Sequence, residues 1–287
     1  MTDEYQLKEG TDKWVRYIKW RVRKNKNFLG VFIGQTGSGK SYGALSLADI
    51  LSDGKLPKEN ICFTGKEFIK RLRTGLADGT LKKGDVIVWD EAGVDLNSKQ
   101  WMAATHRAIN IVMQIFRKEN IVVLFTVPFL SFIDSDTRKL IHTCFRTKRI
   151  DFTTKELVTS PINLQPNQMS GKIYTHNLKA KVPVGNTSRK VKVKNIRIPL
   201  ARQDLIDYYE GVKNNFNESQ YEKSEKVFDD FEGKDNEIDV EYYKKLIDDY
   251  YNIHKDRTND EWANILNIER KRLYRSGLNR YLAKKKI

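Results

Sequence analysis

Short apolar runs alternate with helix-like segments through the middle of the chain. Apolar runs occupy residues 28–33, 61–63, 86–89 and 121–127, and the segments between them repeat their apolar residues at helical spacing. Short strands that alternate with helices are typical of a parallel sheet with crossover helices. The pattern therefore predicts an α/β fold with a mainly parallel sheet flanked by helices.

The segments on either side of this pattern have a different character. We assign residues 1–26 to a basic N-terminal helix, and residues 27–200 to the α/β domain. Within that domain residues 172–200 are strand-rich and predict a β-hairpin decoration. Residues 201–235 are interpreted as a charged linker, and residues 236–287 as a small helical domain that resembles a helix-turn-helix unit.

One glycine-rich loop stands between the first apolar run and the first helical segment. Residues 34–41 read GQTGSGKS and match the pattern G-x-x-x-x-G-K-[ST] at every position. In such a P-loop, or Walker A motif, glycines let backbone N–H groups wrap around phosphates at a helix N-terminus. The nucleotide-binding residues predicted for ATP are Gly34, Gln35, Thr36, Gly37, Ser38, Gly39, Lys40 and Ser41.

Two adjacent acidic residues lie about fifty residues after the P-loop lysine and are candidates for the metal-binding and catalytic groups. The apolar run VIVW delivers Asp90 and Glu91 at its end, in the form of a Walker B strand. We expect Lys40 to reach the β and γ phosphates, and Ser41 and Asp90 to hold Mg²⁺ through oxygen atoms. Glu91 is the candidate that polarises water for attack on the γ phosphate. The sequence thus predicts a P-loop NTP hydrolase that uses ATP and Mg²⁺.

The next apolar run, IVVLFTV, contains Thr126 near its end. If this strand lies between the two motif strands, Thr126 sits near the γ phosphate. Its hydroxyl then either senses that phosphate by hydrogen bonding or serves only as a residue that favours strands. Both interpretations remain open on the sequence.

Charge changes the picture by indicating a partner. The chain has 52 Lys and Arg against 37 Asp and Glu, a net charge of +15, which favours a polyanion, with DNA as the expected partner. Lys190, Lys192 and Lys194 share one face of a predicted strand, where they either contact phosphates or protect an exposed edge. The C-terminal helices carry further cations and could dock on DNA or on protein; these are Arg270, Lys271, Arg272, Arg275 and Arg280.

Other classes are disfavoured by length and composition. The longest apolar run has about half of the roughly 20 residues that span a bilayer, so we expect no transmembrane segment. The N-terminus lacks the pattern of a signal peptide, which predicts a cytoplasmic location. Cys62 and Cys144 lie in apolar contexts and are expected to be reduced core residues.

The order of these motifs resembles the FtsK/HerA superfamily of DNA-pumping ATPases, over residues 28–152. The features that carry the resemblance are the P-loop, VIVWDEAG, a long helical segment, RKENIVVLFTVP and SFIDSDTRKLIHTCFRTKRI. The resemblance implies a class with an additional central strand and a catalytic glutamate, working as a homo-oligomer that is usually a hexameric ring. It also implies an arginine that reaches the neighbouring subunit's γ phosphate, with Arg117 as first candidate and Arg138 and Arg146 as alternatives.

These features together predict an ATP-hydrolysing, DNA-binding motor in replication, transfer or packaging, of prokaryotic, plasmid or viral type. Two alternatives remain open. One is an assembly or secretion ATPase that resembles the zonula-occludens-toxin-like proteins. The other is a helicase loader that uses ATP as a switch without translocating.

Overall fold

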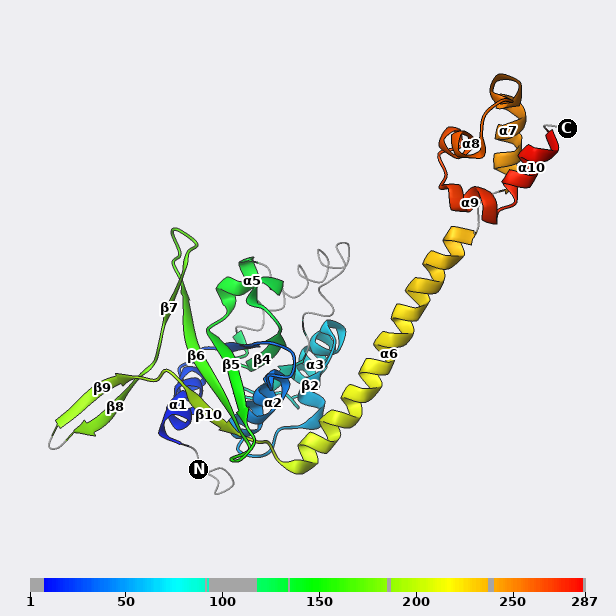
Figure 1. Ribbon diagram of the computed structural model, residues 1–287. Helices are drawn as coiled ribbons and strands as arrows, with labels where there is room; N and C mark the ends of the chain where they lie inside the picture. The colour runs from blue at the N-terminus through cyan, green and yellow to red at the C-terminus, as the bar shows by residue number, and fades with distance from the viewer. Residues whose placement is uncertain are drawn as a thin grey trace. The chain divides into compact units, whose positions relative to one another are not determined.

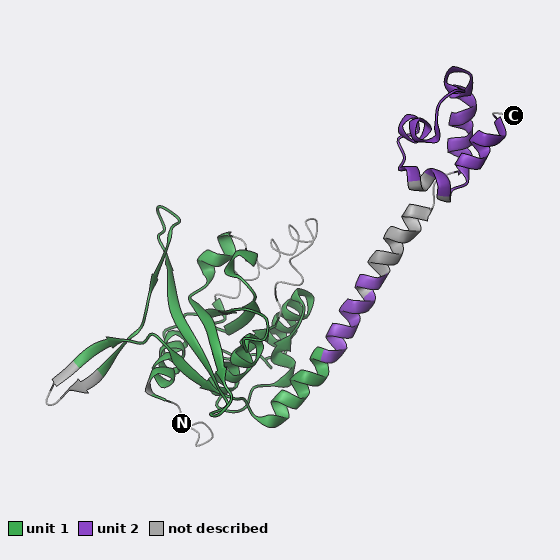
Figure 2. Ribbon diagram, in the orientation of Figure 1, with its two compact units in different colours: residues 1–213 green, residues 214–287 purple. Residues whose placement is uncertain are grey.

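The computed structural model describes residues 8–90, 92, 118–133, 135–184, 187–236 and 240–285. The chain divides into two compact units, Met1–Lys213 and Asn214–Ile287 (Figure 2). The first unit holds the sheet and the P-loop, and the second is helical.

The first unit is built from the elements labelled in Figure 1. In chain order they are α1 (Glu9–Arg23), β1 (Phe28–Ile33), α2 (Lys40–Leu51), η1 (Lys58–Asn60), β2 (Ile61–Cys62), α3 (Gly65–Ala77), β3 (Val86–Trp89), β4 (Val122–Val127), η3 (Leu130–Phe132), α5 (Ser135–Leu140), β5 (Thr143–Asp151), β6 (Glu156–Pro166), β7 (Ile173–His176), β8 (Lys179–Val184), β9 (Thr187–Lys192) and β10 (Ile196–Pro199). Helix α6 (Gln203–Asn236) starts in this unit and continues into the second.

The main sheet has eight strands, in the order β10-β6-β5-β1-β4-β3-β2, with β7 also paired to β6. From β5 to β2 the neighbours are parallel, while β6 pairs antiparallel with β5, β7 and β10. The predicted α/β class with a mainly parallel sheet is confirmed. Strand β4 lies between β1 and β3, the two motif strands, which is the arrangement that the family resemblance implies.

The central strands are buried along almost their whole length. Strands β3 and β4 are buried at every residue, and β1 at every residue except Ile33. Helices pack on a parallel sheet from both sides, which is why these strands read as continuous apolar runs instead of alternating ones. Helix α2 is itself buried from Gly43 to Leu51, so the segment that follows the P-loop is fixed by the core.

Residues 172–200, predicted as a β-hairpin decoration, contain two different kinds of strand. Strands β7 and β10 extend the main sheet beside β6, whereas β8 and β9 form a separate two-stranded sheet (Figure 1). The chain leaves this two-stranded sheet after Lys192 and enters the main sheet at Ile196. From Lys190 to Lys194 the lysines occupy the even-numbered positions, whereas Ile196 and Ile198 occupy them afterwards, and the exit from the ribbon explains this change.

The expected N-terminal helix packs on the core of the first unit, and the expected linker begins within that unit. Helix α1 buries Trp14 and Ile18 completely, and the Trp14 ring meets Phe145 of β5 edge-on at 5.8 Å. Helix α6, Gln203–Asn236, occupies nearly all of the segment expected as a charged linker, residues 201–235, and extends one residue beyond it. Cys62 and Cys144 are buried and free, and burial raises the pKa of each thiol to about 12.

In the described part of the second unit, four helices follow α6. They are α7 (Val240–His254), α8 (Asn259–Ile265), α9 (Arg270–Arg275) and α10 (Leu278–Lys285). Their core gathers around the fully buried Trp262, with Ile247 and Leu273 among its neighbours. Thr258 caps α8 through a reciprocal capping box with Glu261. Among the helices described in either unit, none combines the length and apolar character needed to cross a membrane.

The burial of Trp14 predicts that α1 contributes to the stability of the core unit. Replacing Trp14 by Ala leaves a large cavity and is expected to lower the free energy of unfolding by about 3 to 5 kcal/mol. The matched control is Trp20→Ala on the same helix, where the side chain is 45% exposed. We expect the control to lose about 1 kcal/mol or less. Urea unfolding of both variants measures the difference, and equal losses would refute a docked α1.

Candidate nucleotide-binding site

The P-loop joins the end of β1 to the start of α2, as the motif requires. Strand β1 ends at Ile33, the loop covers Gly34 to Gly39, and α2 begins at Lys40. Gly39 stands directly before the helix with φ +84°, a left-handed conformation that suits glycine. The eight predicted residues therefore form the loop before α2 and the first two residues of that buried helix, a place that favours anions.

Strand β5 supports this loop from its neighbouring position beside β1. Thr147 donates a hydrogen bond to the Ile33 carbonyl at 3.0 Å, and its hydroxyl lies 2.7 Å from the hydroxyl of Ser38. A Cβ at Gly34 would lie only 1.9 Å from the Thr147 Oγ1. Gly34 is thus required by a close approach, and Thr147 is a supporting residue that the motif alone does not reveal.

Lys40 and Ser41 occupy the first turn of α2. The Lys40 Nζ donates to the Gln35 carbonyl at 2.9 Å, so its ammonium lies over the loop. Ser41 directs its Oγ toward Lys213 of α6, whose Nζ is 3.5 Å away. Lys40 therefore contacts the loop itself, and Ser41 contacts α6.

Asp90 follows β3 and lies at the same edge of the sheet as the P-loop. Its side chain is completely buried, and the Thr126 hydroxyl of β4 donates to its Oδ1 at 2.7 Å. In register, Thr126 pairs with Phe32 of β1, one residue before the end of that strand. Thr126 therefore orients the Asp90 carboxylate in this structure, while its role as a phosphate sensor stays a prediction.

Helix α6 supplies two side chains to Asp90 that no motif in the sequence predicts. The Tyr209 hydroxyl donates to Asp90 Oδ2 at 2.6 Å, and the Lys213 Nζ lies 3.2 Å from the same oxygen. Tyr209 is 1% exposed and stacks on Phe63 at 5.7 Å. Tyr209 and Lys213 are four residues apart and share one helix face. The four-residue spacing is the only sequence feature that groups Tyr209 with Lys213. Nothing in the sequence links these two residues to Asp90, which lies 119 residues before Tyr209.

The oxygens of Ser41 and Asp90 fit a divalent cation of the magnesium type. Mg²⁺ prefers a few protein oxygens together with water and phosphate oxygens, and a hydroxyl plus one carboxylate is such a set. A positive charge already occupies this position, since the Lys213 ammonium lies within 3.5 Å of Ser41 Oγ and 3.2 Å of Asp90 Oδ2. The place between these two oxygens therefore accepts a cation.

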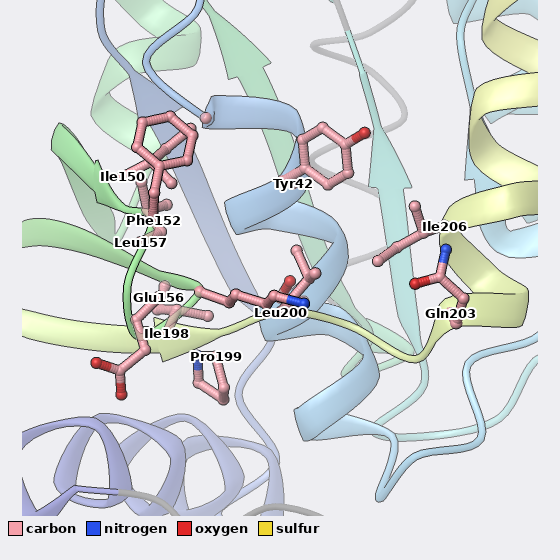
Figure 3. A pocket seen from close by; sticks show the side chains of 13 residues that line it. Tyr42, Ile150, Phe152, Glu156, Leu157, Ile198, Pro199, Leu200, Gln203 and Ile206 are labelled. Atoms are coloured by element: carbon pink, nitrogen blue, oxygen red, sulfur yellow. The ribbon is translucent and has the colours of Figure 1, made fainter.

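An apolar pocket of about 370 Å³ opens beside the P-loop (Figure 3). Ile150, Phe152 and Leu157 of the β5–β6 region line one side, and Gln203 and Ile206 of α6 line the other, with Tyr42 of α2 between them. Gly39 belongs to its lining, so the pocket is continuous with the loop. Burial and a hydrogen bond to Glu210 raise the pKa of Tyr42 to about 12, so the phenol stays protonated and donates.

Glu91 and Arg117 lie outside the described residues. Of the alternative arginines, Arg138 lies in α5 and Arg146 in β5. Arg146 is exposed and pairs in register with Ile33, the residue before the P-loop. The structure thus places Arg146 at the edge of the sheet that carries the P-loop.

The cation between Ser41 and Asp90 predicts a measurable role for Lys213. The variant Lys213→Met removes a charged hydrogen bond from a buried carboxylate and is expected to lose about 1 to 3 kcal/mol of stability without Mg²⁺. It also removes a competitor for the two oxygens, so half-maximal nucleotide binding should need severalfold less Mg²⁺. Thermal unfolding and binding titrations measure both effects. Lys66→Met, an exposed site on α3, is the control. A raised Mg²⁺ requirement in Lys213→Met would contradict this competition.

Comparisons with known proteins give distant structural likenesses. No family model matches the chain, and no curated protein matches it. Among solved structures, it is similar to the N-terminal domain of zonular occludens toxin from Neisseria meningitidis, with 13% identity, 53% of this chain and 93% of that chain covered, and a TM-score of 0.30.

Two further solved structures show likenesses of the same kind. EssC (ATPases 2 and 3) from Geobacillus thermodenitrificans matches with 15% identity, a TM-score of 0.32, and coverage of 68% of this chain and 44% of that chain. The DnaC helicase loader matches with 19% identity, a TM-score of 0.26, and coverage of 44% of this chain and 76% of that chain. Similarities at this level assign no function, so the function is inferred from the chain's own residues.

Proposed function

We propose that the chain is a P-loop ATPase that hydrolyses ATP to drive work on DNA. One observation carries the proposal: Lys40, Ser41 and the buried Asp90 converge at one edge of a mainly parallel sheet, around a position that accepts a cation. Phosphate-binding backbone, a cationic side chain and a pair of hard oxygen ligands are the components that phosphoryl transfer requires.

Each residue has a part in this chemistry. The helix N-terminus and Lys40 neutralise the phosphate oxygens, while Ser41 and Asp90 would hold Mg²⁺, which neutralises further phosphate charge when it is bound. Thr126 and Tyr209 fix the carboxylate through the hydrogen bonds already described. Glu91 follows Asp90 directly and is assigned the general base that polarises the attacking water.

The apolar pocket beside the loop is assigned to the adenine base. Its volume of about 370 Å³ lies within the usual range for small-molecule sites, and its lining is mostly apolar with the Gln203 amide as a polar group. Gly39 lines both the pocket and the phosphate loop, so one nucleotide can extend from one to the other.

The distribution of charge supports DNA as the partner of the ATPase unit. Residues 1–213 carry 37 Lys and Arg against 21 Asp and Glu, whereas residues 214–287 carry 15 against 16. The whole positive excess therefore belongs to the unit that contains the P-loop, where a polyanion is attracted. The chain would work as a ring-shaped homo-oligomer. In that ring Arg117, or Arg146 beside the P-loop, would reach the γ phosphate bound by the neighbouring subunit.

The proposal predicts ATP hydrolysis that increases when DNA is added. Lys40→Ala is expected to lower the rate at least about a hundredfold by weakening phosphate neutralisation. Glu91→Gln should lower it about as much while ATP still binds, because the base acts only in the chemical step. Phosphate-release assays and nucleotide titrations measure these effects, with Lys55→Ala as an exposed control. Turnover that ignores DNA would argue against a DNA motor.

The base assignment predicts a separate effect at Phe152, whose side chain is 83% exposed. Phe152→Ala should weaken ATP binding about threefold to tenfold by removing a stacking surface. Binding of inorganic triphosphate should not change, because that probe has no base. Calorimetric titration of both ligands measures the difference. Parallel weakening of both ligands would place the base elsewhere.

A further inference from the structure

The two-stranded sheet formed by β8 and β9 carries lysines in facing pairs. Lys179 lies directly opposite Lys192, and Lys181 directly opposite Lys190. Residues directly opposite each other in an antiparallel pair share a face, and so do residues two apart on one strand. These four residues, which we name the lysine quartet, therefore occupy one face of the ribbon, and all four side chains are exposed.

The sequence around the quartet offers nothing to neutralise it. From residue 157 to residue 203 the chain contains nine Lys and Arg and no Asp or Glu. Two of these cations, Arg197 and Arg202, are ion-paired to acids from elsewhere in the first unit. None of the quartet's ammonium groups has a carboxylate within ion-pair distance in the part of the chain that the structure describes.

Such an arrangement is unfavourable for the protein alone. Like charges directly opposite each other destabilise a β-ribbon, and a two-stranded sheet is only marginally stable by itself. Protection of an exposed edge needs single lysines, and does not need them facing each other in two consecutive pairs on the same face. The facing pairs instead place the Cβ atoms of four lysines roughly 5 to 8 Å from one another on one face.

We propose that the lysine quartet binds the phosphate backbone of duplex DNA. This inference rests on the proposed function for the identity of its partner, and assigns the contact to the ribbon instead of the C-terminal helices. A two-stranded ribbon is one of the shapes that the major groove of DNA admits. Lysine ammonium groups contact phosphates as point charges, so the binding is insensitive to base sequence.

The chemistry of the ribbon favours duplex DNA over the other polyanions. Single-stranded nucleic acid is normally held by aromatic side chains on which bases stack, and membrane surfaces by cations combined with apolar groups that insert. The two strands contain no aromatic residue, and the apolar pair Ala180 and Val191 lies on the face opposite the quartet. The ribbon extends away from the main sheet, where a rod-like partner can reach it (Figure 1).

The test replaces all four lysines of the quartet by Gln in the full chain. Binding to a labelled duplex of mixed sequence is measured without nucleotide across a series of salt concentrations. We expect the affinity at low salt to fall at least about tenfold. The slope of log K against log salt should shrink by about 3 to 4, because each phosphate that a lysine no longer neutralises removes about 0.9 from it.

Matched variants separate the surface from general charge and from folding. The charge control replaces four exposed lysines outside the ribbon by Gln: Lys55, Lys66, Lys70 and Lys82. Its slope should change by less than about 1. Replacing the quartet by Arg should retain binding. The Gln variant should unfold at the same or a higher temperature than the parent, because repulsion between facing lysines is removed.

The outcomes are distinguishable from failure of the proposed function. Equal losses in the quartet and control variants would overturn the inference. The inference would also be overturned if the Gln variant still bound duplex DNA but no longer bound phosphatidylserine vesicles or single-stranded DNA. If the parent hydrolyses no ATP but the Gln variant still loses duplex affinity, the proposed function is wrong and the lysine quartet remains a DNA-binding surface. If DNA stimulates hydrolysis equally in parent and quartet variants, the function stands and the surface fails.

Discussion

A completely buried carboxylate, that of Asp90, organises the edge of the sheet that carries the P-loop. A charge without solvent is costly unless it is paired and hydrogen-bonded. Asp90 meets this requirement with donors from two distant segments, the Thr126 hydroxyl of β4 and the Tyr209 and Lys213 side chains of α6. The same contacts that compensate the charge also hold the start of α6 against the core of the first unit.

This arrangement links the position between Ser41 and Asp90 to the start of α6. Any cation that takes the place between Ser41 and Asp90 must compete with Lys213 for the same oxygens. Tyr209 remains stacked on Phe63 and buried, so Lys213, at 20% side-chain exposure, is the more readily displaced of the two. Occupancy of the site and the environment of α6 are therefore coupled through one side chain.

The positively charged side chains of the first unit differ in whether a carboxylate neutralises them. Where cations lie near the core they are paired, as with Arg202 and the buried Asp49. On the β8–β9 ribbon they face each other in pairs, which the isolated chain does not require for folding. Paired cations stabilise the fold, whereas the facing lysines are available to a partner.

The sequence by itself determined the α/β class, the position of the P-loop and the strand that ends at Asp90, whereas only the tertiary structure decided which distant residues complete the site. The first set depends on local patterns, namely glycine spacing and the apolar periodicity of strands and helices. Periodicity does not tell which strands join the main sheet, so only the structure restricts the predicted hairpin to β8 and β9. Thr147, Tyr209 and Lys213 carry no motif, and they reach the P-loop and Asp90 because β5 pairs with β1 and α6 packs on the core. Alternation likewise revealed Lys190 and Lys192, but the register of β8 against β9 placed their partners opposite them. Each strand's periodicity is written in its own residues, whereas contacts between segments far apart in the chain form only when the whole core packs.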